Sequence, residues 1–127
     1  MRILEHLKYT KSHEWVASMP GGNLRVGITD FAQAKMGDIV FINLPSLGDR
    51  VSVGGSLTDI ESVKAVADVY SPLTGEVVAV NTALEDAPET LNAAPYEAWI
   101  CEIAGVTDTE ELMDAAAYGA FCEAEGE

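Results

Sequence analysis

The chain has 127 residues, 48% of them hydrophobic, which is enough to bury one core without the help of disulfides or metals. Twenty-one acidic residues against seven basic ones leave a formal net charge of -14, and this excludes sequence-independent binding to nucleic acid, which depends on Lys and Arg. No apolar stretch approaches the roughly 18 residues of a membrane helix, and Cys101 and Cys122 are too far apart in sequence for a metal or redox pair.

The first element that the sequence predicts clearly is a short helix over residues 30–35. Thr29 or Asp30 can cap its first turn, and Gln33 stands where a capping box places its second member if Asp30 is the cap. The helix should end by Gly37.

A short internal sequence repeat, which we call the echo, begins just after this helix. Residues 37–43, GDIVFIN, return as residues 75–81, GEVVAVN, and each copy reads as a strand that leads into a loop. Two similar halves that face each other would form a flattened β-sandwich, each covering the apolar face of the other. A coincidence between two Val-rich strands is the alternative. The echo therefore favours a mainly β fold.

Lys64 lies between the two copies of the echo. Two stretches rich in β-branched residues meet at residues 63–65, and no Gly, Asn or Pro is present there to form an ordinary tight turn. Pro72 and Gly75 follow the lysine after eight and eleven residues. The pattern places Lys64 at the tip of a hairpin, and a solvated surface lysine is the alternative.

The last predicted element is a helix over residues 109–122. Residues 107–111, TDTEE, supply a cap and first-turn acids. An apolar stripe at helical spacing follows them, formed by Leu112, Ala116 and Ala120 beside Met113, Ala117 and Phe121. We expect this stripe to pack on the protein's own sheet rather than on a partner.

The sequence contains no recognisable catalytic constellation. His6 and His13 do not form a zinc-binding spacing with their neighbouring acids, and we expect no metal site. The chain also lacks a nucleophile elbow, a phosphate loop and a dinucleotide fingerprint. We therefore expect a non-catalytic carrier subunit rather than an enzyme.

Several separated stretches together carry a resemblance to a known family. They are KYTKSHEWV (8–16), VGITD (26–30), GDIVF (37–41), ESVKA (61–65), SP (71–72), GEV (75–77), LN (91–92) and PYE (95–97). The chain resembles the lipoyl- and biotin-carrying domains and, within that superfamily, the H proteins of the glycine cleavage system. The resemblance implies a barrel-sandwich hybrid of two similar halves, with a short helix near 30–35 and a C-terminal helix.

The resemblance also implies a modified lysine. Lys64 would be the site of covalent lipoyl attachment, and Val63 and Ala65 argue against biotin because biotin carriers usually have methionine on both sides of their lysine. Glu61, Val63, Ala65 and Gly75 are the residues that we expect the modifying enzyme to recognise. That enzyme would be a lipoate ligase, or an octanoyltransferase followed by lipoyl synthase.

A reaction cycle and its partners follow from the same resemblance. The pyridoxal-phosphate-dependent glycine decarboxylase (P protein) would load the arm with the aminomethyl group of glycine. The tetrahydrofolate-dependent aminomethyltransferase (T protein) would unload it, and dihydrolipoamide dehydrogenase (L protein) would reoxidise it. In this family the loaded arm folds into a cleft on the carrier, and the matching motif here contains Ser12 and Glu14.

We expect one lipoyl-carrier domain over residues 1–127, with its lipoyl-type core over about 24–105 and the C-terminal helix over about 109–122. No membrane partner is expected. A cytoplasmic, bacterial setting is expected, and a mitochondrial matrix location only if a transit peptide is absent from the given chain. Two other functions remain open: a lipoyl carrier that mainly donates its lipoyl group to other proteins, and an unmodified interaction module.

Overall fold

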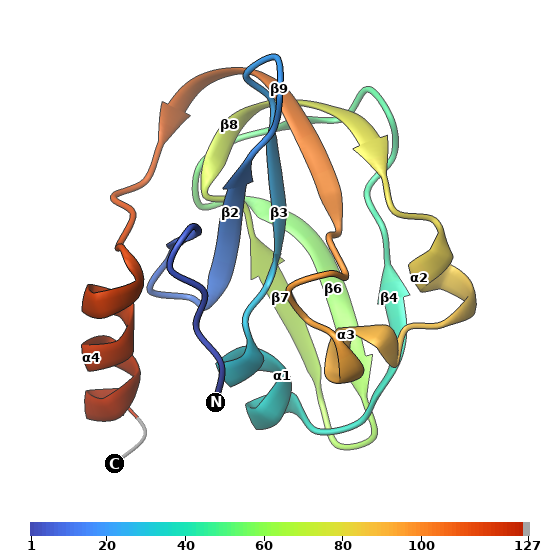
Figure 1. Cartoon of the computed structure of the whole chain (residues 1–127). Helices are drawn as coiled ribbons and strands as arrows, with labels where there is room; N and C mark the ends of the chain where they lie inside the picture. The colour runs from blue at the N-terminus through green and yellow to red at the C-terminus, as the bar shows by residue number, and fades with distance from the viewer. Residues whose placement is uncertain (126–127) are drawn as a thin grey trace.

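The computed structural model describes residues 1–125, which form two antiparallel sheets and several short helices (Figure 1). The first sheet has the strand order β1-β2-β3-β9-β8-β5 and the second the order β4-β6-β7. The strands of the first sheet are β1 (Lys8–Tyr9), β2 (Glu14–Ser18), β3 (Leu24–Ile28), β9 (Cys101–Thr109), β8 (Leu73–Val80) and β5 (Arg50–Val51). Those of the second are β4 (Ile39–Asn43), β6 (Ser56–Ser62) and β7 (Val66–Tyr70).

The expected mainly β fold of two facing halves is confirmed, and the two sheets do not close into a barrel. The two copies of the sequence echo lie in different sheets, one in β4 and the other in β8. Between the two copies the chain forms β5 of the first sheet and then the β6–β7 hairpin of the second sheet, whose tip points away from the body of the molecule near α1 (Figure 1).

The apolar faces of the two sheets enclose the main core. Both sheets supply residues that are almost completely buried, as expected for strands whose inward side chains interdigitate. They include Val26, Ile28, Ile42, Ile60, Val69, Leu73, Val77 and Ile103. A second cluster joins the N-terminal segment to the last helix and contains Leu7, Tyr9, Trp15, Tyr118 and Cys122.

The expected short helix is present as α1 (Asp30–Met36). Its cap is Thr29, whose hydroxyl accepts a hydrogen bond from the Ala32 amide, while Gln33 donates to the Asp30 side chain. Gly37 ends the helix at a φ of 79°, in the region that favours glycine. Two further short helices, α2 (Ala83–Asp86) and α3 (Thr90–Ala93), lie between β8 and β9.

The predicted start of the C-terminal helix is wrong. The helix α4 spans Ala115–Glu125, whereas Thr109, where the helix was expected to begin, is the last residue of β9. Thr109 pairs with Leu73 of β8, so the caps expected at 107–109 belong to a strand. Asp114 supplies the cap instead, because its carboxylate accepts a hydrogen bond from the Ala117 amide.

The buried face of α4 also differs from the expected stripe, because its buried residues are Tyr118 and Cys122. None of the helices in residues 1–125 combines the length and the apolar character needed to cross a membrane.

Candidate functional site

The β6–β7 hairpin places Lys64 at its tip, as predicted, and Ser62 closes the turn. The Ser62 amide donates to the Ala65 carbonyl at 2.8 Å. The Ser62 hydroxyl accepts hydrogen bonds from the Lys64 amide at 3.4 Å and the Ala65 amide at 3.2 Å. A serine side chain thus replaces the glycine or asparagine of an ordinary tight turn. Sequence reasoning missed this role of Ser62.

The hairpin tip rests on the segment that follows α1. The Val63 amide donates to the Asp38 carbonyl at 2.9 Å. The Lys64 side chain passes over Gly37, where an added Cβ would stand 3.4 Å from Lys64 Cε. An added Cβ would make an ordinary van der Waals contact there, so the positive φ of Gly37, rather than the lysine stem, accounts for the glycine. Among residues 1–125, no salt bridge or hydrogen bond holds the Lys64 ammonium group.

Asn92 of α3 fixes the segment under the tip. Its side-chain amide group donates to the Gly37 carbonyl and to the Gln33 side chain, both at 2.9 Å. Its side-chain oxygen accepts from the Ile39 amide at 2.8 Å. The Leu91-Asn92 motif was part of the family resemblance, but its structural role could not be read from the sequence because its partners lie more than 50 positions away.

Exposed apolar side chains surround the tip. Phe41 and Val66 flank Glu61 in the register of the three-stranded sheet, and they are 48% and 66% exposed. Val63 is 70% exposed. Glu61 itself is half-buried between these neighbours. The tip therefore offers an apolar surface, with the Glu61 carboxylate among its exposed apolar side chains.

Gly75, which was grouped with the recognition residues, lies in the other sheet. It is buried in β8, and an added Cβ would stand 2.6 Å from Ile103 Cγ2 and 2.7 Å from the Ala104 carbonyl oxygen. Only glycine allows β8 and β9 to approach this closely. Packing between the strands thus explains this glycine.

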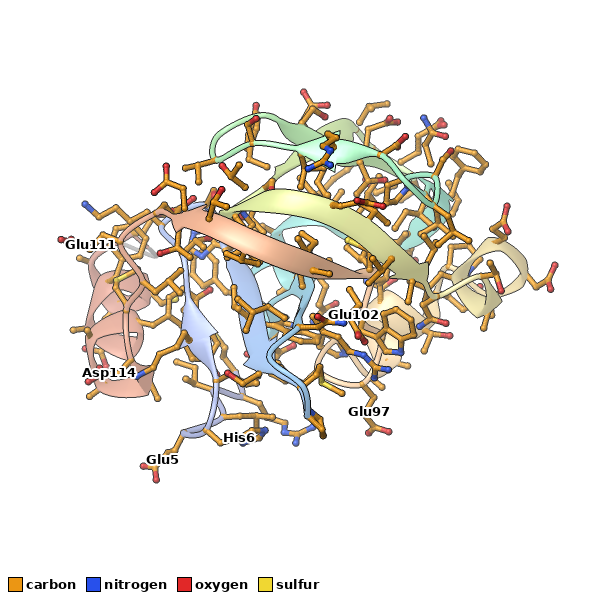
Figure 2. All side chains as sticks on the ribbon, turned by 90° about the horizontal axis from the view of Figure 1, so that it is seen from above. Glu5, His6, Glu97, Glu102, Glu111 and Asp114 are labelled. Carbon is orange, nitrogen blue, oxygen red and sulfur yellow. The ribbon has the colours of Figure 1, made fainter. Side chains whose placement is uncertain are left out.

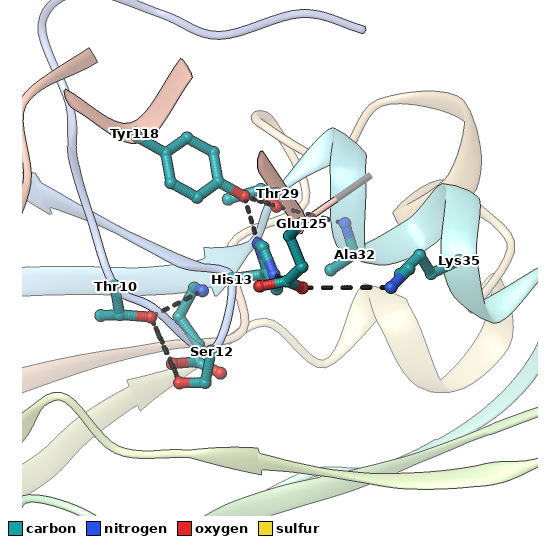
Figure 3. A network of polar contacts seen from close by, with 9 residues as sticks. Thr10, Ser12, His13, Thr29, Ala32, Lys35, Tyr118 and Glu125 are labelled. Atoms are coloured by element: carbon teal, nitrogen blue, oxygen red, sulfur yellow. Dashed lines mark hydrogen bonds and ion pairs between the residues drawn. The ribbon is translucent and has the colours of Figure 1, made fainter. Parts of the chain in front are cut away.

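Ser12 and Glu14, the expected docking residues, lie together at the start of β2. Figure 3 shows Ser12 beside Thr10. Glu14 is only 2% exposed, and its Oε1 atom accepts hydrogen bonds from Ser12 Oγ at 2.6 Å and from Thr10 Oγ1 at 2.7 Å. A buried carboxylate with two hydroxyl donors is a site that can hold a cation or an amine.

Burial is the largest influence on the Glu14 carboxyl, and it raises the pKa above the ordinary value for glutamate. The hydrogen bonds from Ser12 and Thr10 counter the rise, the charge of Glu110 adds to it, and a hydrogen bond from the Tyr70 backbone lowers it. The Tyr70 contact places this carboxylate beside β7, which is one strand of the hairpin that carries Lys64.

The two cysteines are held inside the core. Cys101 and Cys122 are free and buried, and burial raises the pKa of Cys101 to about 12. A thiol with so high a pKa is a poor nucleophile. Within residues 1–125, no group of three or more His, Cys, Asp or Glu side chains could hold a metal ion.

The fold is a β-sandwich that presents one lysine at an exposed hairpin tip, an arrangement that suits a carrier-type protein. A family model described as glycine cleavage H-protein matches residues 7–125. The chain belongs to the glycine cleavage H-protein family, which is a family of lipoate-carrying subunits of the glycine cleavage system.

Individual relatives agree with the family model. A glycine cleavage system H protein of Lachnoclostridium phytofermentans is 48% identical over 127 residues, which is 100% of both chains. One from Azoarcus sp. is 52% identical over 118 residues, covering 91% of this chain and 93% of the relative. The crystal structure of a glycine cleavage system H protein from Mycobacterium marinum has a TM-score of 0.87 at 38% identity, covering 98% of this chain and 100% of that chain.

Proposed function

We propose that Lys64 carries lipoate in amide linkage, and that this chain passes the aminomethyl group of glycine between the enzymes of the glycine cleavage system. The observation that carries the proposal is the hairpin tip. Lys64 is exposed, the described residues form no ion pair with it, and its root is fixed by Ser62 and Asp38. Amide formation there removes a charge that no partner in these residues compensates.

Lipoate bound at Lys64 would supply a disulfide that can accept a carbon group and be reduced. The P protein would release carbon dioxide from glycine and load the aminomethyl group. The T protein would pass the one-carbon unit to tetrahydrofolate and release ammonia, and the L protein would restore the disulfide. This chain's contribution is to fix the root of the arm on rigid strands, so that its end can enter three different active sites.

We also propose that Glu14 and Ser12 receive the amine at the end of the loaded arm. Tyr70, the β7 residue beside Glu14, lies six positions beyond Lys64, which is at most about 20 Å at 3.3 Å per residue. From the lysine Cα to the amine of the loaded arm there are about sixteen bonds, so the extended arm reaches on the order of 20 Å. The buried carboxylate would pair with the protonated amine and keep water from its labile carbon.

Peptide mapping tests the attachment site. After incubation with a lipoate ligase, lipoate and ATP, the added mass should appear on the peptide that contains Lys64, and Lys64→Arg should abolish it while thermal stability stays unchanged. A matched variant, Lys35→Arg, should be modified normally. Modification of Lys8, Lys11 or Lys35 in place of Lys64 would reject the proposal, and so would failure of the modified chain to accept the aminomethyl group from the P protein.

A further inference from the structure

His13 lies between the two proposed docking residues, and its backbone is unusual. It is the one non-glycine residue in the described chain with a positive φ, 71°. That conformation is disfavoured for residues with a Cβ, and it persists only where surrounding contacts hold it. Here the turn is closed by hydrogen bonds from the His13 amide to the Thr10 carbonyl at 3.2 Å and from the Glu14 amide to Thr10 Oγ1 at 3.0 Å.

The His13 ring is held mainly by α4. Its Nδ1 atom lies 2.7 Å from the Tyr118 hydroxyl, and its Nε2 atom lies 2.7 Å from Glu125 Oε1 (Figure 3). The Tyr118 hydroxyl also lies 2.7 Å from Thr29 Oγ1, the cap of α1. Every donor and acceptor in this series of hydrogen bonds has a partner if the His13 Nε2–H group donates to Glu125, the Tyr118 hydroxyl donates to His13 Nδ1, and the Thr29 hydroxyl donates to Tyr118.

Aromatic packing reinforces these hydrogen bonds. The His13 ring stacks on Phe31 with centroids 4.4 Å apart and meets the edge of Tyr118 at 5.6 Å. Tyr118 in turn stacks on Tyr9 of β1 at 4.5 Å. The ring of His13 is thus enclosed by α1 and α4, so the strained turn between Ser12 and Glu14 is tied to the docking of the C-terminal helix.

We propose that His13 is a positioning residue: docking of α4 on its ring holds the turn at residues 10–14 in the conformation that keeps Ser12 and Glu14 together and shields Glu14 from water. We use the word latch for α4 together with the two hydrogen bonds that its residues Tyr118 and Glu125 make with the His13 ring. The inference rests on the proposed role of Glu14 toward the loaded arm. When the latch is released, water should reach the Glu14 carboxylate and the protection of the amine should weaken.

Two variants weaken the latch with little change in shape. Tyr118→Phe removes one hydroxyl and keeps the ring that stacks on Tyr9. Its control is Val77→Ala, which destabilises the main core, a cluster separate from the one that contains Tyr118. Glu125→Gln removes a charge at the protein surface, and its control is Glu123→Gln, which makes the same charge change at an exposed position of the same helix.

The first measurement uses the unmodified chain and does not depend on the arm. Carbon-13 NMR of labelled glutamate side chains follows the titration of Glu14, whose signal is assigned by its loss in Glu14→Gln. We expect the titration midpoint of Glu14 to fall toward that of an ordinary glutamate in both latch variants, because burial is the main cause of its elevation. The control variants should leave the midpoint unchanged.

The second measurement follows release of formaldehyde from the loaded chain after its partners are removed. Release should be about two- to tenfold faster in Tyr118→Phe, the range for loss of one hydrogen bond. An unchanged or raised Glu14 midpoint in the latch variants, or an equal fall in the controls, overturns the inference. A midpoint that falls in the latch variants alone, with release unchanged, supports the positioning role and instead rejects Glu14 as the group that protects the amine.

Discussion

Glu14 combines deep burial with an ionisable side chain. A single substitution there should therefore test two things: whether Glu14 protects the amine of the loaded arm, and how it contributes to stability. If it holds the protonated amine of the loaded arm, Glu14→Gln keeps the shape but removes the charge. Hydrogen bonds to charged groups are worth about 1.5–3 kcal/mol, and each 1.4 kcal/mol lost is about a tenfold change in rate.

We therefore expect the loaded Glu14→Gln chain to release formaldehyde and ammonia more than about tenfold faster than the parent. Reduction or oxidation of the empty arm by the L protein should change little, and this reaction serves as the control. The same decay rate in both proteins would exclude Glu14 as the group that protects the amine.

The raised pKa of Glu14 also has a consequence for stability. A carboxyl whose pKa is higher in the folded protein binds its proton more tightly there than in the unfolded chain. Its contribution to stability is complete below the unfolded value, 4.5, and is lost as the pH rises through the raised folded value.

Urea unfolding of the parent and of Glu14→Gln over a series of pH values should reveal this loss. The free energy of unfolding of the parent, minus that of the variant, should be largest below pH 4.5 and should decline above it, by at most about 1.4 kcal/mol per pH unit. A difference that is constant with pH, or that grows as the pH rises, would contradict the burial-raised pKa.

At the scale of the elements, the β6–β7 hairpin carries both the lysine and the surface that a modifying enzyme meets. Glu61 lies three residues before Lys64, between Phe41 and Val66 in the sheet register. Its carboxylate is the nearest acid in the strand to the tip, and it stands among exposed apolar side chains. This combination suits recognition by an enzyme that combines an apolar contact with a cation.

Glu61→Ala should slow lipoylation by a lipoate ligase while changing the free energy of unfolding by no more than roughly 0.5 kcal/mol, as for other surface positions. The matched control is Glu76→Ala, which removes an acid from β8 in the other sheet. Initial rates at a concentration of chain below saturation are the measurement. If Glu61→Ala is modified as fast as Glu76→Ala, the ligase recognises another part of the hairpin.

At the scale of the whole molecule, acidic charge dominates. The net charge is -14. Figure 2 shows acidic side chains that point outward from different parts of the structure, among them Glu5, Glu97, Glu111 and Asp114. The described residues contain few ion pairs that neutralise this charge, and one of them, Arg25 with Glu102, is internal to the first sheet. Such a surface should attract electropositive clefts over a distance set by salt screening.

We expect the rate of lipoylation at low chain concentration to fall as the ionic strength rises from about 0.02 to 0.3 M, because the Debye length shortens over this range. Activation of lipoate by the ligase in the absence of the chain measures the direct effect of salt on the enzyme. A rate of transfer that does not depend on salt, after this correction, would show that the acidic surface has no part in the encounter.

Local signals predicted several features of the fold correctly. The helix α1 was found because its signals act within a few residues: Thr29 accepts from the Ala32 amide, Gln33 donates to the Asp30 side chain and Gly37 ends the helix. The tip at Lys64 was found because two β-branched stretches flank it, although the hydroxyl of Ser62 that closes the turn was missed. The domain limits at 1–127 stay a prediction.

The sequence by itself thus determined the strands of the echo and of the hairpin, the first helix and the place of Lys64 at a tip, since periodicity, caps and turn residues act over short distances. Only the tertiary structure decided where α4 begins, because pairing with β8 extends β9 through Thr109 at the expense of the predicted helix. It also decided that Glu14 is buried and that His13 meets Tyr118, 105 positions away. Burial and partners of this kind depend on residues that are distant in the chain, and no local pattern encodes them.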